Sequence, residues 1–251
     1  MRCVLVLSRG DPVSSTLLDI LTLPLKERGG VEVGQLGEMP VIVFEGEPTE
    51  FSREDVAASL GDCAVFISRH EMANPRPLFA VHTPGSWPEV SIANPCLVST
   101  LYRELCRSAY GDFKCVIEAT HHPPNTSLIS AVFLEVGSGE KEWRDRGAVA
   151  TLLSVLQKAV AGYGECANPT MVIGDLHYTT VASQVADGTI DVGHIVPKYI
   201  EITLDVVKNA LGRHTAPIRK AIIFRKNVKN PHRREILEYL SERGVEVVLK
   251  G

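Results

Sequence analysis

The stretch Cys3-Val-Leu-Val-Leu7, followed at once by Ser8-Arg-Gly-Asp-Pro12, decides the fold class of this chain. Five apolar residues that end at turn-forming residues indicate a buried strand. Helical spacing then begins near Ser14 and stops near Pro24, because proline is incompatible with a helix interior. Short apolar runs and longer segments of helical period go on alternating along the chain. We therefore predict a three-layer α/β/α fold with a mixed, mostly parallel sheet.

The same two patterns predict the remaining elements. The expected strands are 41–44, 64–68, 78–81, 114–118, 131–136, 171–173, 219–224 and 245–249. The expected helices are 98–110, 140–162, 200–211 and 231–243, and Gly244 is a favourable terminator for the last of them. We expect a single domain over residues 1–251, with an excursion at about 29–61 that is rich in Gly, Glu and Pro.

Length and composition are those of an ordinary globular protein. The chain has 251 residues, of which 45% are hydrophobic and 22% are charged, and this usage excludes a disordered chain. No apolar run reaches the roughly 20 residues that a membrane-spanning helix needs, and we find no signal peptide. We therefore expect a cytoplasmic protein without membrane contact, and a monomer by default because no exposed apolar stripe demands a partner.

The six cysteines lie far apart and form no Cys-x-x-Cys pair. This spacing disfavours both a zinc ribbon and the disulfide framework of a small secreted protein, and it fits a reducing cytosol. Cys3, Cys63 and Cys115 lie in or beside strand-like runs. We predict that these three are small core residues.

Basic residues gather in the segment 213–234, which contains eight Lys or Arg and no Asp or Glu in a chain of net charge −4. Such a cluster can neutralise the phosphates of a nucleic acid and release their counterions. A solvated surface turn is the alternative. Besides Arg213, the basic residues of the segment are Arg219, Lys220, Arg225, Lys226, Lys229, Arg233 and Arg234.

Six of the eight histidines follow or interrupt strand-like runs: His70, His82, His121, His122, His177 and His194. The carboxyl ends of parallel strands share one edge of a sheet, so we expect these imidazoles in one cleft. Glu118 and Glu135 add oxygen atoms from the same runs. Neutral imidazole binds zinc or acts as a general base near neutral pH. No compact motif such as His-Glu-x-x-His occurs, so spacing leaves a metal site and an acid–base site both open.

Other motifs narrow the chemistry. A Walker loop and a full Gly-x-Gly-x-x-Gly fingerprint are absent, which disfavours ATP and NAD binding. A Gly-x-Ser-x-Gly elbow is also absent, so attack by activated water is the better expectation. Lys198, four residues after His194, offers a cation for a carboxylate or a phosphate, unless it is simply an exposed lysine.

Several segments, taken in order, carry a resemblance. They are Ser68-Arg-His70, Val81-His-Thr-Pro-Gly-Ser-Trp87, Glu118-Ala-Thr-His-His122, Phe133-Leu-Glu-Val-Gly-Ser138, His177-Tyr178, Gly193-His-Ile195 and Pro197-Lys-Tyr199. In this order they resemble the archaeal-type D-aminoacyl-tRNA deacylase family, which is also found in plants. The resemblance covers residues of about 68 to 199. The sequence departs from the family pattern at residues 123–126, after the double histidine, and at residues 174–176.

The resemblance implies a phosphorylase/hydrolase-like fold and a zinc-dependent enzyme that hydrolyses the ester between a D-amino acid and tRNA. The residues that it suggests as metal ligands are His82, His121, His122, His177 and Glu135. The suggested catalytic residues are His121, His122, Glu118 and His194. The tRNA surface would consist of Lys198, Arg219, Lys220, Arg225, Lys226, Lys229, Arg233 and Arg234.

Two other interpretations remain open from sequence. The implied fold class also hosts peptidases and nucleoside phosphorylases, so the chain could act on a small substrate. Alternatively, it could be a tRNA-binding module without catalysis, in which the histidines only close loops.

Overall fold

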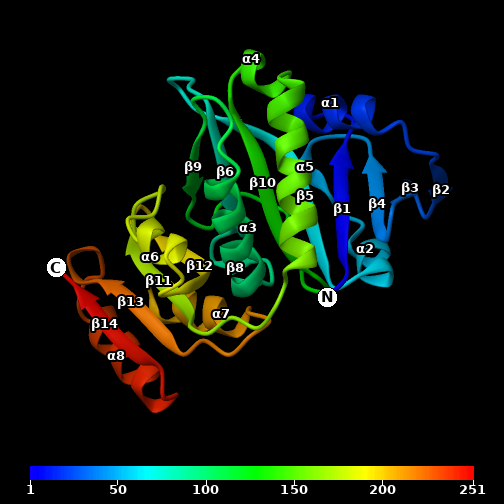
Figure 1. Ribbon diagram of the computed structural model, residues 1–251. Coiled ribbons are helices and arrows are strands. Elements are labelled where there is room, and N and C mark those ends of the chain that lie inside the picture. The colour runs from blue at the N-terminus through cyan, green and yellow to red at the C-terminus, as the bar shows by residue number, and fades with distance from the viewer.

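The computed structural model describes all 251 residues and contains two main sheets (Figure 1). The first sheet has eight strands in the spatial order β2-β3-β4-β1-β5-β10-β6-β9. Their bounds are β1 Cys3–Ser8, β2 Lys26–Arg28, β3 Val31–Leu36, β4 Met39–Phe44, β5 Cys63–Glu71, β6 Leu78–His82, β9 Lys114–Ile117 and β10 Ser130–Ser138. The central strands β4, β1, β5 and β10 run parallel, whereas β6 runs antiparallel to β10. The predicted α/β class with a mixed, mostly parallel sheet is confirmed.

A second, fully parallel sheet has the order β12-β11-β13-β14. Its strands are β11 Pro169–Asp175, β12 Asp191–Pro197, β13 Lys220–Phe224 and β14 Glu246–Lys250, and a small hairpin pairs β7 Gly85–Ser86 with β8 Glu89–Val90. The sequence did not predict β12, because polar Asp191 and His194 interrupt its apolar pattern. Both are buried, and Asp191 is paired with Arg103 at 3.0 Å.

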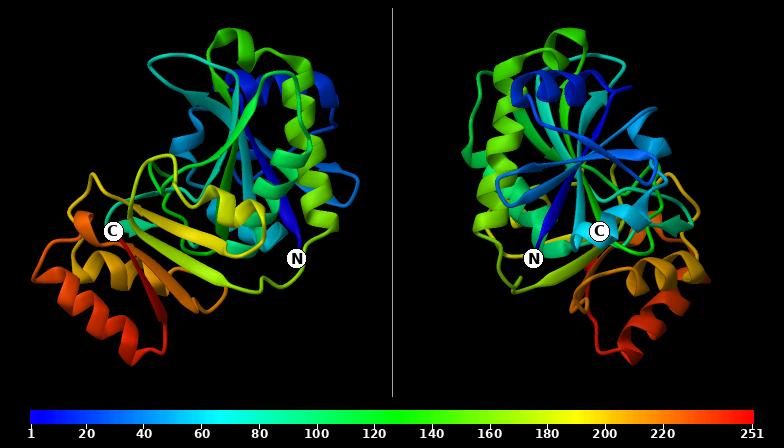
Figure 2. Two further views of the ribbon diagram at one scale, coloured as in Figure 1. Left: turned by 60° about the vertical axis from the view of Figure 1, so that its left-hand side comes forward. Right: turned by 90° about the vertical axis from the view of Figure 1, so that its right-hand side faces the viewer.

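The helices cover both sheets and also separate them (Figure 2). Their bounds are α1 Pro12–Leu21, α2 Glu54–Leu60, α3 Pro95–Arg107, α4 Glu140–Trp143, α5 Arg146–Ala161, α6 Ala182–Ala186, α7 Leu204–Gly212 and α8 His232–Glu242, with short 3-10 helices at Pro48–Glu50 and Arg225–Asn227. Helices α1, α3 and α5 pack on one face of the first sheet and α2 packs on the other. Helix α3 also packs against β12 and α6, whereas α7 and α8 cover the far face of the second sheet.

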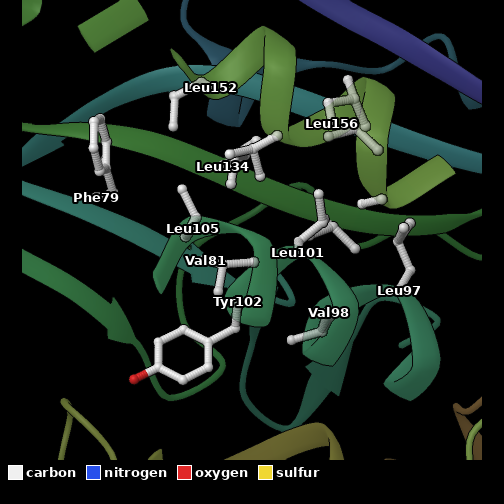
Figure 3. Close-up of a cluster of buried hydrophobic side chains, with 14 of the residues drawn as sticks. Phe79, Val81, Leu97, Val98, Leu101, Tyr102, Leu105, Leu134, Leu152 and Leu156 are labelled. Carbon is white, nitrogen blue, oxygen red and sulfur yellow. The ribbon is translucent and has the colours of Figure 1, made fainter. Parts of the chain in front are cut away.

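The largest hydrophobic core contains 35 buried residues and is centred on α3 (Figure 3). Leu101 and Leu105 of α3 lie beside Leu156 of α5 and Leu134 of β10. The apolar stripe that the sequence shows in helix α5 therefore faces this core, as helical spacing predicts.

Capping residues explain where the observed helices differ from the predicted ones. Asp11 accepts hydrogen bonds from two main-chain N–H groups of α1 and starts this helix at Pro12. Asp145 caps α5 in the same way and splits the predicted helix 140–162 into α4 and α5. Thr203 caps α7, so that helix begins at Leu204 rather than at residue 200. The predicted excursion at 29–61 contains β3, β4 and α2.

The prediction that Cys115 is a small core residue is wrong, because Cys115 is only half-buried and forms a disulfide with Cys106. A second disulfide joins Cys96 to Cys166. Both bonds involve α3, and the second one ties this helix to the segment that leads from α5 into β11. Cys3 and Cys63 are buried and free, as predicted. None of the helices is long and apolar enough to cross a membrane.

Candidate functional site

The strand register of the first sheet brings three polar side chains together. Strand β10 pairs with β5 and with β6, and this register places Gly137 beside His70 and Phe133 beside His82. Glu135 lies between these two positions on β10 and points to the same face as both neighbours, because side chains on one face recur every second residue. One strand therefore positions Glu135 between two imidazoles.

The segment 118–122 adds three more polar side chains and joins the two sheets. The main-chain N–H of Ala119 donates to the carbonyl of His177 at 2.7 Å, and that of Thr120 donates to the carbonyl of Ile195 at 2.9 Å. The segment therefore runs between the first sheet and the second. The complete cluster contains His70, His82, Glu118, His121, His122, Glu135 and His177.

The cluster opens into a cavity of about 350 Å³. Five residues of the cluster line it: His70, His121, His122, Glu135 and His177. The other lining residues are Asp11, Glu47, Pro48, Thr49, Ser68, Arg69, Glu71 and Phe133. Its volume lies in the range of small-molecule sites. The polar lining can hold a substrate with several hydrogen-bonding groups, such as an amino acid ester.

His70 is a buried cation held by two carboxylates. Its Nδ1 lies 3.4 Å from Glu118 Oε2 and 3.3 Å from Glu135 Oε2, and its Nε2 lies 3.0 Å from the hydroxyl of Tyr178. Burial opposes charging, but hydrogen bonds to the two carboxylates outweigh it and raise the pKa of His70 to about 11. Burial likewise acts to raise the pKa of Glu135, yet His70 and His82 bring it down to about 2. Both members of this pair are therefore ionised at neutral pH.

Two neutral imidazoles, those of His121 and His122, present free nitrogen lone pairs. The Nδ1–H of His121 donates to the carbonyl of Ala119 at 2.8 Å, and that of His122 donates to the carbonyl of Pro123 at 2.7 Å. These bonds fix the tautomer and leave each Nε2 as an acceptor. Burial, and after it the proximity of His82, lowers the pKa of His121 to about 3. His121 is therefore neutral at pH 7.

His82 adds a third ring to this group. Burial acts to lower the pKa of His82, but Glu135 and Glu118 outweigh it and raise this pKa above its ordinary value. His82 is fully buried, and neither of its ring nitrogens has a hydrogen-bond partner. A buried polar group without a partner costs about 1–3 kcal/mol. His82, His121 and His122 each offer one ring nitrogen, and these three atoms lie within 4.8 Å of one another. Three imidazole nitrogens at this spacing fit the ligand preference of zinc.

The backbone of His122 is unusual. Its φ of 43° lies in the left-handed region, and the only other non-glycine residue with positive φ is Thr22, at the end of α1. Such conformations cost of order 1–3 kcal/mol and tend to persist where the surroundings enforce them at functional sites. The double histidine is held in this loop so that both rings face His82, with centroids 4.4 and 4.8 Å from it.

The structure places His194 outside the cluster, in contrast to its predicted catalytic role. Its side chain is fully buried, its Nδ1 bonds to the hydroxyl of Thr120 at 3.0 Å and its Nε2 to the carbonyl of Ser91 at 3.0 Å. Burial lowers the pKa of His194 well below its usual range. Because both nitrogens are occupied, His194 positions the segment before His121 and does not face the cavity.

The predicted RNA-binding residues do not form one patch. Arg219 and Lys220 lie at the amino end of β13, where Lys220 pairs with Glu246 at 3.4 Å. Arg225, Lys226 and Lys229 follow the carboxyl end of the same strand, and Lys198 follows the carboxyl end of β12. Arg233 donates to the carbonyl of Arg225, and Arg234 lies 3.8 Å from Glu238.

Sequence reasoning gave no role to His70 and Tyr178. Both stand in segments that carried the resemblance, and His70 was recognised as a histidine that follows a strand. The missing information was the pairing of β5 with β10, which places this imidazole against Glu135.

We expect acidification to destabilise the protein through half-buried His214. Its Nε2 accepts the main-chain N–H of His194 at 3.1 Å, so the folded state requires the neutral ring. Loss of hydration lowers its pKa to about 4, below the ordinary value of about 6.5 for histidine. Between pH 6.5 and 4 the unfolded chain binds the extra proton, and the free energy of unfolding falls by at most about 1.4 kcal/mol per pH unit for this group. Urea unfolding between pH 7 and 4.5 measures how the free energy of unfolding changes with pH. If His214→Asn loses stability with falling pH as steeply as the parent protein, His214 is not the responsible group.

We also expect Gly137→Ala to disturb His70. A Cβ at this position would lie 2.8 Å from both Cβ and Cδ2 of His70. The ring must therefore move away from Glu135, and we expect at least a tenfold loss of activity and about 1–3 kcal/mol of lost stability. Thermal unfolding measures the stability, and an assay of enzymatic activity measures the loss of turnover. The control is Gly212→Ala, whose added Cβ meets no atom within 4 Å; equal losses in the two variants would disprove the steric explanation.

The fold and the cavity define an α/β protein with an imidazole- and carboxylate-lined site of hydrolytic type. The sequence profile described as D-aminoacyl-tRNA deacylase matches residues 59–248. The chain is 60% identical to the D-aminoacyl-tRNA deacylase of Pyrobaculum aerophilum and 63% identical to that of Pyrobaculum calidifontis, and each alignment covers 99% of both chains. This chain belongs to the D-aminoacyl-tRNA deacylase family.

More distant comparisons agree. The D-aminoacyl-tRNA deacylase of Aeropyrum pernix is 28% identical over 98% of this chain and 99% of its own length. The crystal structure of a conserved protein of unknown function superposes with a TM-score of 0.85 at 22% identity, covering 99% of this chain and 95% of that chain. The superposition supports the two-sheet fold alone.

Proposed function

We propose that this protein hydrolyses the ester bond of D-aminoacyl-tRNA and releases a D-amino acid and free tRNA. Membership of the deacylase family supports the substrate class. The cavity supports the chemistry, because it combines neutral imidazoles with ionised carboxylates in one polar pocket. The observation that carries the proposal is the set of three imidazole nitrogens of His82, His121 and His122 beside Glu135.

We further propose that His82, His121 and His122 hold a zinc ion. The unpartnered nitrogens of buried His82 and the fixed tautomers of His121 and His122 support this choice. A zinc ion bound there supplies a Lewis acid that acidifies water and polarises the ester carbonyl. Glu118 and His177, together with His121, offer a further set of ligand atoms within 4.8 Å of one another.

Glu135 and the pair formed by Glu118 and His177 then transfer protons. Glu135 lines the cavity 3.7 Å from His82 Nε2 and 4.0 Å from His122 Nε2, and it accepts a proton from the attacking water. His177 lines the opening, and its Nε2 lies 3.0 Å from buried Glu118. Glu118 holds the ring of His177 so that it delivers a proton to the departing ribose oxygen. Water adds to the carbonyl carbon, the bond to this oxygen breaks, and an acid and an alcohol are formed.

Hydrolysis of D- and L-tyrosyl-tRNA by the purified protein tests this function. We expect turnover of the D-form at least about 100-fold faster than of the L-form, loss of turnover after chelation, and recovery when zinc is added. Equal rates on both forms would refute the stereospecific deacylase. Turnover that resists chelation would refute the zinc site and leave the proton-transfer roles in place.

A further inference from the structure

The carboxyl edge of the second sheet begins at the cavity and extends away from it. The four parallel strands of this sheet end side by side, in the order β12, β11, β13 and β14 (Figure 1). His177 follows β11 and lines the cavity. Lys198 and Tyr199 follow β12 on one side, and Arg225 and Lys226 follow β13 on the other. The residues after three neighbouring strands therefore lie side by side, and His177 among them lines the cavity.

The cations of this edge are not neutralised by the protein. Lys198, Arg225, Lys226 and Lys229 are exposed, and no carboxylate lies within 4.0 Å of any of their charged groups. Hydrogen bonds to the end of β11 hold the two segments that carry these cations. The main-chain N–H of Lys198 donates to the carbonyl of Asp175 at 2.8 Å, and the side chain of Asn227 donates to the carbonyl of Gly174 at 2.8 Å. At the amino end of β13, by contrast, Lys220 already has a carboxylate partner.

An exposed aromatic ring lies at the same place. Tyr199 is 57% exposed, and its hydroxyl lies 3.1 Å from Nδ1 of His177, which holds the ring beside the opening. Leu176, on the neighbouring strand end, is 42% exposed. A flat ring next to free cations is the combination that binds single-stranded nucleic acid, because bases stack and phosphates pair.

We propose that the carboxyl edge of the second sheet binds the single-stranded 3′ end of the tRNA. Tyr199 stacks on a terminal base, and Lys198, Arg225 and Lys226 contact phosphates, so that the aminoacyl ester enters the cavity at His177. The ends of β12 and β13 are separated by two strand spacings, roughly 10 Å, which is the length of about three stacked nucleotides. This inference rests on the proposed function and assigns a binding role to only part of the basic segment 213–234.

Single charge reversals at the two ends of β13 test the location. Arg225→Glu is expected to raise KM for D-tyrosyl-tRNA about tenfold with kcat changed less than twofold, and to lower the salt dependence of binding by about one phosphate contact. Arg219→Glu makes the same charge change at the opposite end of the strand and should leave KM within twofold. Equal effects of the two variants would show that total charge matters rather than this edge, and would overturn the proposal.

Two variants of Tyr199 test stacking. Tyr199→Ala removes the ring and is expected to raise KM about tenfold, in line with about 1–3 kcal/mol per stacked base. Tyr199→Phe keeps the ring and loses only the contact with His177, so its KM should rise less. An equal rise in both variants would assign the effect to the hydroxyl and overturn the stacking role.

Binding of uncharged tRNA separates this inference from the proposed function, because it needs no turnover. Fluorescence anisotropy should show Kd weakened about tenfold in Arg225→Glu and unchanged in Arg219→Glu. If the parent protein binds tRNA in this way but hydrolyses no D-tyrosyl-tRNA, the proposed function fails and the RNA edge stands. If the parent hydrolyses D-tyrosyl-tRNA and neither substitution weakens binding, the function stands and the RNA edge is refuted.

Discussion

Replacing His122 with asparagine is expected to lower kcat/KM for D-aminoacyl-tRNA on the order of 1,000-fold, with little change in folding stability. His122 contributes one of the three free imidazole nitrogens, and its side chain makes one hydrogen bond, to the neighbouring carbonyl of Pro123. Asparagine tolerates the left-handed backbone at this position, so the loop keeps its path. The loss therefore reports on the missing nitrogen rather than on misfolding. A deacylation assay measures kcat/KM, and thermal unfolding measures folding stability. The zinc content of the purified protein shows whether the metal still binds.

The matched control is His232→Asn, which removes a histidine from the start of α8, far along the chain from the cluster and paired with Glu235. We expect its activity and metal content to equal those of the parent protein. Full activity in His122→Asn would contradict the role of the imidazole set. Full zinc content with lost activity would contradict ligation by His122 and assign it a role in proton transfer instead.

The cluster could be largely predicted from the sequence because histidines at strand ends are visible as a pattern. His70 lies near the carboxyl end of β5 and His177 follows β11, and a clear apolar run precedes each of them. The carboxyl ends of parallel strands meet at one edge of the sheet, but this does not explain why His82 joins the cluster. Strand β6 runs antiparallel to β10, so His82 meets Glu135 from the opposite direction.

Local patterns could not predict what depends on buried polar partners. His194 shares the strand-end pattern of the site residues, yet its ring is fully occupied by Thr120 and a main-chain carbonyl. Strand β12 escaped prediction for the same reason, since Asp191 is acceptable in a buried strand only because Arg103 pairs with it. Likewise, the basic residues of segment 213–234 form one cluster in the sequence. In the structure, the five-residue strand β13 separates Arg219 from Arg225, so these two residues lie at opposite ends of the strand.

Loss of the disulfide between Cys96 and Cys166 is expected to lower the free energy of unfolding by about 4 kcal/mol. The bond closes a loop with a sequence separation of 70 residues, so it restricts the unfolded chain strongly. The other disulfide, Cys106–Cys115, spans only 9 positions, and its loss should cost less, just under about 3 kcal/mol. For a chain of this size, 4 kcal/mol corresponds to a decrease in Tm of about 10 °C. Thermal unfolding of Cys96→Ser and Cys106→Ser, each without reductant, measures the order of the two effects.

The single and double variants of this disulfide distinguish a cross-link from packing. Cys96 is 7% exposed, so its replacement also removes some buried contact. If the cross-link dominates, Cys96→Ser, Cys166→Ser and the double variant lose the same stability, because breaking the bond once is sufficient. Additive losses would instead mean that each sulfur contributes through its own contacts. The bond ties α3 to the segment entering β11, and β11 carries His177 towards residues of the first sheet. The same disulfide therefore stabilises the fold and helps to hold β11 at the position where His177 meets Glu118.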